Sequence, residues 1–357
     1  MFDIQDPRYE NGKLLNEALL EACNEALYGA GTYAFVSADG VKLLMKNNIF
    51  EQFLTRGRYE LLIGMDEITN TRTLATLNQF CSQYPNLKAN AFMHNTKEST
   101  FHPKYSWFRY ENGGMLVLGS GNLTAKGLRR NTEAFVMQRV NEEEILSIEK
   151  KWADWLNSSK EYIKSLQDPE VIQRAEENAE KIIKNAKVTD WEEENDAWKF
   201  DLNSKMLIAE ITTGWGYEKK KYYQVDIDIQ TGNTFFGTEF YPKTNVILRK
   251  IHPQGFIEDM EIATINITPN KKYQIELLAQ NNIQKTSKGF PFVIFVRLSL
   301  RTFLYTIILP NDRGYRQVKK EMDIRRRDIN NLALYQCSVE TLKDKVFSLA
   351  ILEYLNK

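Results

Sequence analysis

A histidine and a lysine two residues apart, His102 and Lys104, are the residues of this sequence best suited to chemistry on a phosphate. In a β-strand, side chains two positions apart project from the same face, so the pair would act together. An ammonium beside an imidazole disfavours protonation of the ring, which leaves a ring nitrogen free as a nucleophile. The lysine also brings positive charge to a phosphoryl group on which negative charge develops.

A Gly-Ser-Gly-Asn turn and a glutamate follow in the same stretch, residues 101–135. Gly119 and Gly121 would let the backbone approach a ligand closely, and the serine and asparagine add neutral donors. We expect Glu133, on the strand after the turn, to orient His102 and fix its tautomer. Together these residues suit phosphoryl transfer without a metal ion. The candidate catalytic residues are His102, Lys104, Ser120, Asn122 and Glu133.

Each of these features alone also has a structural explanation. A single histidine at a strand start is more often structural than catalytic, and a single strand lysine is usually a solvated edge charge. The turn before Leu-Thr-Ala-Lys-Gly-Leu also fits a simple strand-to-helix connection with Thr124 near the helix cap. The order and spacing of the whole set favour the catalytic interpretation.

Strands and helices alternate in the first part of the chain. Short apolar runs predict strands, and longer segments with helical periodicity lie between the first of them. The predicted strands are 31–38, 59–65, 87–94, 101–110, 113–120 and 132–140. This alternation predicts an α/β layered domain over residues 1–150.

The remaining chain divides into an acidic helical part and a β-rich part. Residues 141–200 contain 16 acidic and 9 basic residues, and we expect 151–197 to form an acidic helical linker. Such a linker is suited to lie over a basic groove, although a plain solvated connector is the simpler explanation. Residues 198–357 show period-two alternation that predicts a barrel or sandwich, closed by a helical tail over SVETLKDKVFSLAILEYL.

The composition is that of a soluble globular protein, with 43% apolar and 26% charged residues among 357. The first residues lack the pattern of a signal peptide, and no run is long and apolar enough to span a membrane. Three scattered cysteines fit a reducing compartment, so we expect a cytoplasmic protein. The net charge is zero, but residues 201–357 carry 23 basic and 17 acidic residues. That excess suggests a polyanionic partner, or else ordinary surface variation.

His-x-Lys followed by Gly-Ser-x-Asn resembles the half-site motif of the phospholipase D superfamily. The wider string FHPK…GSGNLT…GL..N.E is similar to its restriction-endonuclease branch, of the BfiI and NgoFVII type. The resemblance covers residues 1–150 and implies that His102 attacks the scissile phosphate to form a phosphohistidine. It implies further that Lys104, Asn122 and Ser120 hold the phosphate oxygens, while Glu133 supports His102. The common superfamily pattern has an aspartate where this chain has Arg109, but the restriction branch uses an acid at the position of Glu133.

The superfamily chemistry uses two histidines, one as nucleophile and one as general acid for the leaving oxygen. This chain has a single His-x-Lys, because His94 lies in HNTK and His252 in HPQ. The resemblance therefore implies a homodimer through the nuclease domain, in which two copies of residues 101–135 share one centre. The two histidines would then titrate as a coupled pair.

For the second half, the resemblance implies a pseudobarrel related to the plant B3 DNA-binding domain. Residues 313–327 contain seven basic and two acidic residues, enough to contact several phosphates. Asn and Gln side chains near such loops are suited to read base edges. A β domain of another purpose with basic surface residues is the alternative. The candidate DNA-binding residues are Lys219, Lys220, Lys221, Lys285, Lys288, Arg313 and Arg316.

These features predict a metal-independent, sequence-specific endonuclease that cleaves double-stranded DNA in a restriction system and needs no cofactor. A methyltransferase or helicase is a possible partner, and no membrane is expected. One alternative is a phosphodiesterase that acts on a lipid or another small diester. Another is a DNA-binding scaffold subunit with an inactive half-site, partnered by a helicase, since the chain lacks a Gly-x4-Gly-Lys-Ser/Thr loop of its own.

Overall fold

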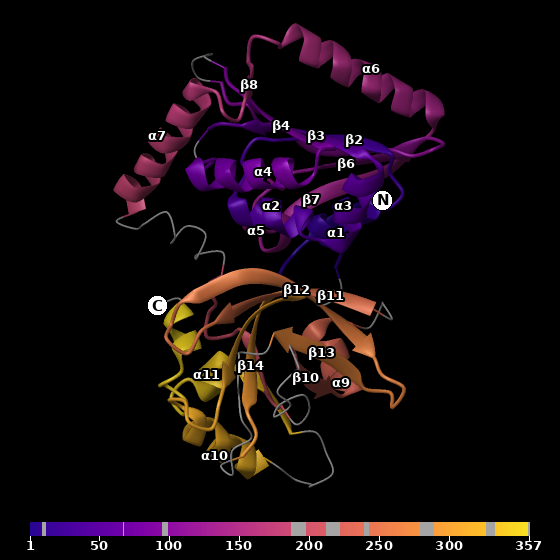
Figure 1. The fold of residues 1–357 in the computed structure, drawn as a ribbon. Helices are drawn as coiled ribbons and strands as arrows, with labels where there is room; N and C mark the ends of the chain where they lie inside the picture. Colours follow the sequence, from indigo (N-terminus) through magenta and orange to yellow (C-terminus); the bar gives the residue numbers. More distant parts are fainter. Residues whose placement is uncertain are drawn as a thin grey trace. The chain divides into compact units, whose positions relative to one another are not determined.

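The computed structural model divides the chain into two compact units, Met1–Ala197 and Trp198–Lys357 (Figure 1). Each unit is built around its own eight-stranded sheet. The structure describes residues 1–8, 12–66, 68–94, 99–186, 198–211, 222–238, 243–278, 289–325 and 333–355.

The sheet of the first unit has the order β1-β7-β6-β5-β2-β3-β4-β8. Strands β2, β3 and β4 are parallel, and every other neighbouring pair is antiparallel. Its strands are β1 (Phe2–Gln5), β2 (Tyr28–Tyr33), β3 (Arg58–Gly64), β4 (Leu87–Phe92), β5 (Lys104–Arg109), β6 (Gly114–Gly119), β7 (Glu133–Val140) and β8 (Ile163–Ser165). The predicted α/β domain is therefore confirmed, with a mixed sheet that contains three neighbouring parallel strands.

Helices cover both faces of this sheet, with α6 on one side and α1 to α5 on the other (Figure 1). Most of them begin at a Ser, Thr or Asn whose side chain accepts a hydrogen bond from the first turn, which satisfies a free backbone donor. The helices are α1 (Leu15–Cys23), α2 (Ala38–Met45), α3 (Asn48–Arg56), α4 (Thr71–Gln83), α5 (Ala125–Arg129), α6 (Glu142–Ser158) and α7 (Pro169–Ala186).

The segment predicted as a helical linker, 151–197, is packed into the first unit as far as the structure describes it. Trp152 of α6 is buried in a core cluster with Ala30 and Trp107 of the sheet. Strand β8 pairs with β4, and Asn178 of α7 donates to the carbonyls of Met65 and Thr69 at 2.8 and 2.9 Å. The linker prediction is wrong for this part, because the apolar stripe of α6 packs on the sheet and β8 extends it.

The second unit is mostly β, as the period-two pattern predicts. Its sheet has the order β10-β13-β12-β11-β15-β14-β9-β16, antiparallel except for the parallel pair β11 and β15. The strands are β9 (Lys205–Glu210), β10 (Tyr222–Ile227), β11 (Lys243–Ile251), β12 (Ile257–Ile267), β13 (Tyr273–Leu278), β14 (Phe292–Ser299), β15 (Thr302–Ile308) and β16 (Leu334–Ser338). Their inward side chains form one core cluster that includes Phe295 and Phe303.

Short helices complete the second unit. They are α9 (Ile229–Thr231), the π-helical turn η1 (Gly232–Phe236), α10 (Tyr315–Arg325), α11 (Val339–Leu342) and the 3₁₀ turn η2 (Ala350–Tyr354). The predicted helical tail is therefore present only as two short pieces, α11 and η2. Among the described helices of the chain, none is long and apolar enough to cross a membrane.

Candidate active site

One edge of the first sheet collects the candidate catalytic residues. The parallel strands β2, β3 and β4 end at this edge, as does β6, while the antiparallel strands β5 and β7 begin there. His102 and Lys104 lie at the start of β5, the Gly-Ser-Gly-Asn turn follows β6, and Glu133 begins β7. The strand order therefore places neighbouring strand ends from three separate parts of the sequence side by side.

His102 and Lys104 are in direct contact. The Lys104 Nζ lies 2.9 Å from Nδ1 and 3.0 Å from Nε2 of the imidazole. His102 is exposed, whereas only 9% of Lys104 is exposed. The Phe35 ring, just after β2, packs edge to face with the imidazole at a centroid distance of 5.8 Å. His102, the candidate nucleophile, is thus accessible to a substrate. The buried Lys104 ammonium and the Phe35 ring hold its imidazole in place.

The charge of Lys104 is sensitive to its surroundings. Burial lowers the pKa of this amine below its usual value of 10.5, and the Glu133 carboxylate opposes the shift. Behind the lysine, on the same face of β5, the Ser106 hydroxyl contacts the hydroxyls of Tyr33 and Tyr59 at 2.8 and 2.9 Å. This buried hydroxyl cluster fixes β5 against β2 and β3. The sequence does not predict this cluster, because no local pattern links these three residues.

Asn122 is oriented by the loop after β2. Its Oδ1 accepts a hydrogen bond from the Phe35 backbone N–H at 3.2 Å, which leaves the amide Nδ2 as the donor available to a ligand. The neighbouring Leu123 accepts from the Ser37 N–H at 3.1 Å and forms a parallel bridge with Val36. The turn is therefore fixed to the end of β2.

The glycines of the turn are required by protein packing rather than by an approaching ligand. A Cβ on Gly119 would lie 2.6 Å from Phe135 Cβ, and one on Gly121 would lie 2.4 Å from a methyl of Leu15. The expectation that these glycines open space for a substrate is wrong, since protein atoms fill that space. Gly127 has the same role but was not among the predicted site residues. A Cβ added there would lie 2.5 Å from the Asn122 carbonyl oxygen. This glycine lets α5 begin directly against the turn.

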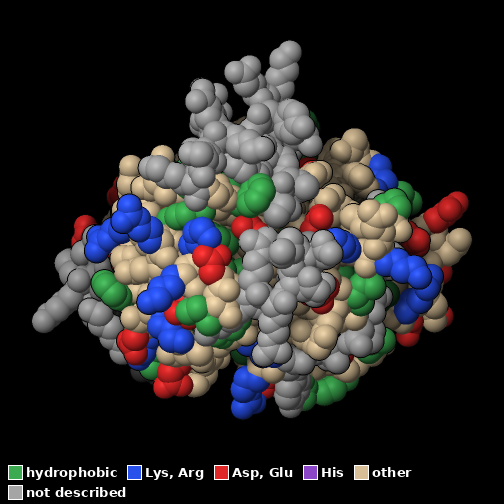
Figure 2. Space-filling view, turned by 90° about the horizontal axis from the view of Figure 1, so that it is seen from below, with side chains coloured by type: hydrophobic (Ala, Val, Ile, Leu, Met, Phe, Trp, Pro, Cys, Tyr) green, Lys and Arg blue, Asp and Glu red, His purple; other side chains and the backbone are tan. Residues whose placement is uncertain are grey.

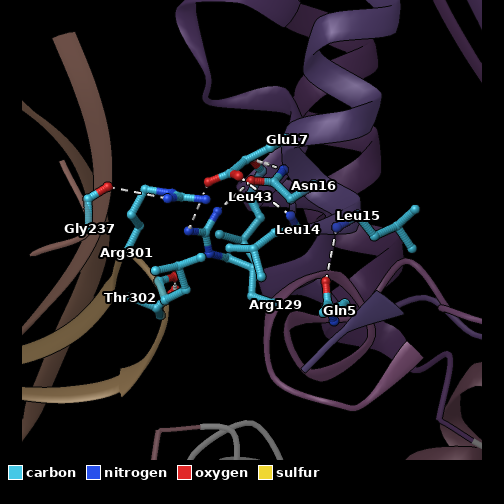
Figure 3. Close-up of polar contacts among 11 residues, drawn as sticks. Gln5, Leu14, Leu15, Asn16, Glu17, Leu43, Arg129, Gly237, Arg301 and Thr302 are labelled. Atoms are coloured by element: carbon cyan, nitrogen blue, oxygen red, sulfur yellow. Dashed lines mark hydrogen bonds and ion pairs between the residues drawn. The ribbon is translucent and has the colours of Figure 1, made fainter. Parts of the chain in front are cut away.

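Side-chain contacts join the elements around this turn to one another (Figure 3). Gln5, at the end of β1, accepts from the Leu15 N–H at 2.9 Å and donates to the Gly127 carbonyl at 3.0 Å. Arg129 of α5 donates to Asn16 Oδ1 of α1 at 2.9 Å. Together they tie β1, α1 and α5 into one support beneath the turn.

Glu133 does not contact His102 in the way that the sequence analysis expected. Its carboxylate accepts hydrogen bonds from the Ser120 hydroxyl and from Asn131 Nδ2, the latter at 3.0 Å. Ser120 Oγ in turn accepts from the Ala134 N–H at 3.1 Å. Within the described residues, the hydrogen bonds of Glu133 thus fix Ser120 and the loop, and its charge acts on Lys104.

Arg109 occupies the position where the superfamily pattern has an aspartate. It lies at the far end of β5 from Lys104, where its guanidinium pairs with Glu142 and, at 2.8 Å, with Glu149 of α6. Glu142 also accepts from the Gly113 N–H at 2.9 Å. Arg109 therefore anchors α6 to the sheet and lies outside the cluster of candidate catalytic residues.

The structure places two of the predicted DNA-binding residues together. Arg313 and Arg316 line an open pocket of about 820 Å³ beside the start of α10, together with Lys319 and Phe347. Phe347 is 70% exposed, and Lys319 pairs with Asp323 at 2.6 Å. In the described part of the chain, neither arginine has an ion-pair partner. The other predicted DNA-binding residues, Lys219, Lys220, Lys221, Lys285 and Lys288, lie outside the described residues.

Basic side chains do not form one unbroken patch on the face drawn in Figure 2. Lysines and arginines are interspersed with acidic side chains there. Across the residues that the structure describes, no group of three His, Cys, Asp or Glu side chains lies together as metal ligands would.

Comparison with known proteins gives only distant structural likenesses. No family model matches the chain, and no curated protein matches it. Solved structures similar to it include NucT from Helicobacter pylori, at 15% identity over 46% of this chain and 98% of that chain, with a TM-score of 0.32. Nuc from Salmonella typhimurium, a phospholipase D family member, matches at 14% identity over 46% of this chain and 96% of that chain, with a TM-score of 0.33.

A third likeness is to the N-terminal domain of LlaJI.R1 from Helicobacter pylori. It has 13% identity over 37% of this chain and 97% of that chain, with a TM-score of 0.26. Likenesses at this level assign neither an activity nor a substrate. The functional assignment rests on the residues at the sheet edge.

Proposed function

We propose that this protein is a metal-independent phosphodiesterase of DNA whose nucleophile is His102. The observation that carries the proposal is an exposed imidazole in contact with a buried ammonium, 2.9 Å away, beside the oriented amide of Asn122. The resemblance of the surrounding motif to the phospholipase D superfamily supports it. In the reaction, a ring nitrogen of His102 bonds to phosphorus while the bond to the leaving oxygen breaks. Water then attacks phosphorus, and the N–P bond breaks to release the product.

Lys104 and Asn122 are placed to stabilise the phosphate oxygens in this reaction. The ammonium offers positive charge and the amide Nδ2 offers a neutral donor, and both are held before a substrate arrives. Donors that are already in position stabilise developing charge without reorganisation. Ser120 is held by Glu133 and supports the turn in this scheme.

The leaving oxygen needs a proton, and in this proposal the donor is His102 of a second copy of the chain. Supporting this, strands β1 and β6 present apolar side chains to solvent, with Phe2 64% and Leu118 50% exposed. The register places both opposite Val136 of β7, in one row across the sheet. Leu118 also lies opposite Tyr105, which packs on Trp152 of α6. A second copy of the chain that packed on this apolar row would cover the part of the sheet face beside α6. This part lies next to the strand ends that carry the candidate catalytic residues.

Incubation of the protein with labelled duplex DNA in EDTA tests the function. We expect cleavage in EDTA, with the active species sedimenting as a dimer. Parallel reactions with Mg²⁺ and with Mg²⁺ plus ATP separate the alternatives. Cleavage only with ATP would indicate a partnered motor, and binding without cleavage in every buffer would indicate a scaffold with an inactive half-site.

The second unit is, in this proposal, the part that recognises double-stranded DNA for a restriction system, whose partner would be a methyltransferase of the same sequence specificity. Arg313 and Arg316 would contact backbone phosphates beside the pocket at α10, because neither has an ion-pair partner among the described residues. A guanidinium on a phosphate releases counterions and makes binding depend on salt.

Substitution of both arginines by alanine should weaken DNA binding about equally for all sequences. A plot of the logarithm of the binding constant against the logarithm of the salt concentration has a negative slope. Its magnitude should decrease by about 2, which is about one unit for each lost phosphate contact. The matched control is Arg313→Lys with Arg316→Lys, which keeps the charges and should keep the slope. An unchanged slope in the alanine variant would show that these residues do not touch the DNA backbone.

A further inference from the structure

The chain carries a second histidine at the catalytic edge, two residues after the end of β4. The His94 side chain is 13% exposed, and its Nε2 lies 3.2 Å from the backbone N–H of Phe101, which donates to it. Phe101 directly precedes His102. An imidazole nitrogen therefore holds the backbone next to the proposed nucleophile.

Among the described residues, few other hydrogen bonds hold the backbone around His102; one is donated by Lys104 Nζ to the His102 carbonyl at 3.4 Å. Strand β5 begins at Lys104, so His102 itself lies outside the paired strand. Pro103 has no N–H to donate, although its carbonyl accepts from the Ala34 N–H at 2.9 Å. Besides the contacts of His102 with Lys104 and Phe35, the backbone is thus held on each side, by Ala34 after it and by His94 before it.

Charged groups lie beside His94. Asp66, just beyond β3, has Oδ2 3.7 Å from the His94 Nε2, and its other oxygen lies 3.6 Å from Arg174 of α7. A separation of 3.7 Å is too long for a hydrogen bond, so the Phe101 N–H is the polar partner of Nε2. Arg174 also pairs with Glu177 at 3.7 Å, and it offsets the negative charge of Asp66 beside the ring.

Aromatic packing restrains the same segment from the other side. The Phe101 ring stacks on Phe92 of β4 at a centroid distance of 4.4 Å, and His94 packs on Phe92 at 6.1 Å. Trp155 of α6 stacks on Phe101 at 6.3 Å. The side chain of Phe101 is therefore fixed by rings and its N–H by His94.

We infer that His94 is a positioning residue for the nucleophile: with an unprotonated Nε2 it holds the Phe101 N–H and so sets where the His102 imidazole stands. The inference rests on the proposed function for its kinetic consequence. A nucleophile displaced by a fraction of an ångström loses alignment with phosphorus, while the groups that bind DNA stay in place.

His94→Ala tests this, with His94→Gln as the conservative variant, because the glutamine Oε1 replaces Nε2 as an acceptor. His252→Ala is the matched control, since its Nδ1 also accepts a backbone N–H, from Gln254 at 3.3 Å. We expect His94→Ala to lower kcat about 10- to 100-fold with little change in KM for DNA. His94→Gln should recover most of that loss, and the control should match the unchanged protein.

A second measurement keeps the inference testable without any nuclease activity. Diethyl pyrocarbonate modifies exposed histidines, and peptide mass spectrometry gives its rate at His102. The modification rate of His102 in His94→Ala should differ from that in the unchanged protein. In His94→Gln and in His252→Ala it should equal the rate in the unchanged protein. If cleavage and modification at His102 are both unaffected in a folded His94→Ala variant, the inference is overturned and the proposed function stands. If the unchanged protein never cleaves DNA, the proposed function fails and the modification rates alone decide the role of His94.

Discussion

His102→Ala is expected to abolish cleavage in EDTA, with a loss of at least about 10⁴-fold in kcat, while DNA binding and dimerisation remain. The alanine variant cannot form the N–P bond, and no other described side chain at the sheet edge offers a free imidazole in contact with an ammonium. The loss should be this large because the variant removes the nucleophile of each copy and the general acid of the other.

The covalent intermediate gives a direct check. Radiolabelled DNA mixed rapidly with the unchanged protein and quenched at neutral pH should yield labelled protein, with the phosphoryl group on His102. The His102→Ala variant should yield none, and His252→Ala serves as the control for substitution of a histidine outside the site. Full EDTA-resistant cleavage by His102→Ala would eliminate the proposed mechanism.

Lys104→Met is expected to lower kcat about 10²- to 10³-fold, the range seen when one prepositioned donor is removed from a transition state. Methionine keeps an unbranched apolar chain in the buried position, so the fold should survive. Lys126→Met is the matched control and should leave kcat unchanged, because Lys126 is the exposed residue of α5, close to the same turn. A Lys104→Met variant with full activity would exclude the ammonium from the reaction.

The pH dependence follows from the same lysine. Burial lowers the pKa of Lys104, so the ammonium should lose its proton, and activity should fall, at a lower pH than for an ordinary lysine at 10.5. Glu133 raises that pKa, and Glu133→Gln should therefore move the alkaline fall in rate to still lower pH. The glutamine can still accept from Ser120, which separates the charge of Glu133 from its hydrogen bond. An unmoved alkaline limb would show that Glu133 does not act on Lys104.

The sequence identified the pair at the start of β5 because side-chain direction in a strand depends only on the spacing along it. His102 and Lys104 are two apart, and the structure brings them into contact. The alternation of strands with helices likewise predicted an α/β domain, since periodicity and apolar runs are local properties. The local sequence pattern of residues 151–186 wrongly predicted a solvated connector. In the folded chain, α6 packs on the sheet and β8 extends it, and neither contact can be read from the segment alone.

The partners of the site residues were not predictable in the same way. Glu133 was matched to His102 by order along the chain, but its carboxylate holds Ser120, because the turn after β6 folds back against the start of β7. His94 was set aside since it lacks a lysine two residues on, and its link to Phe101 is visible only once β4 and the start of β5 meet at one edge.

The sequence by itself determined which residue types could attack a phosphate and on which strand they lie, because strand geometry fixes these over a few residues. The groups that support them follow from the strand order of the folded sheet. That order joins residues tens of positions apart, which leave no periodic pattern in the sequence. That order places Phe35, Asn122 and Glu133 around His102 and Lys104, and it brings His94 to the backbone of the nucleophile.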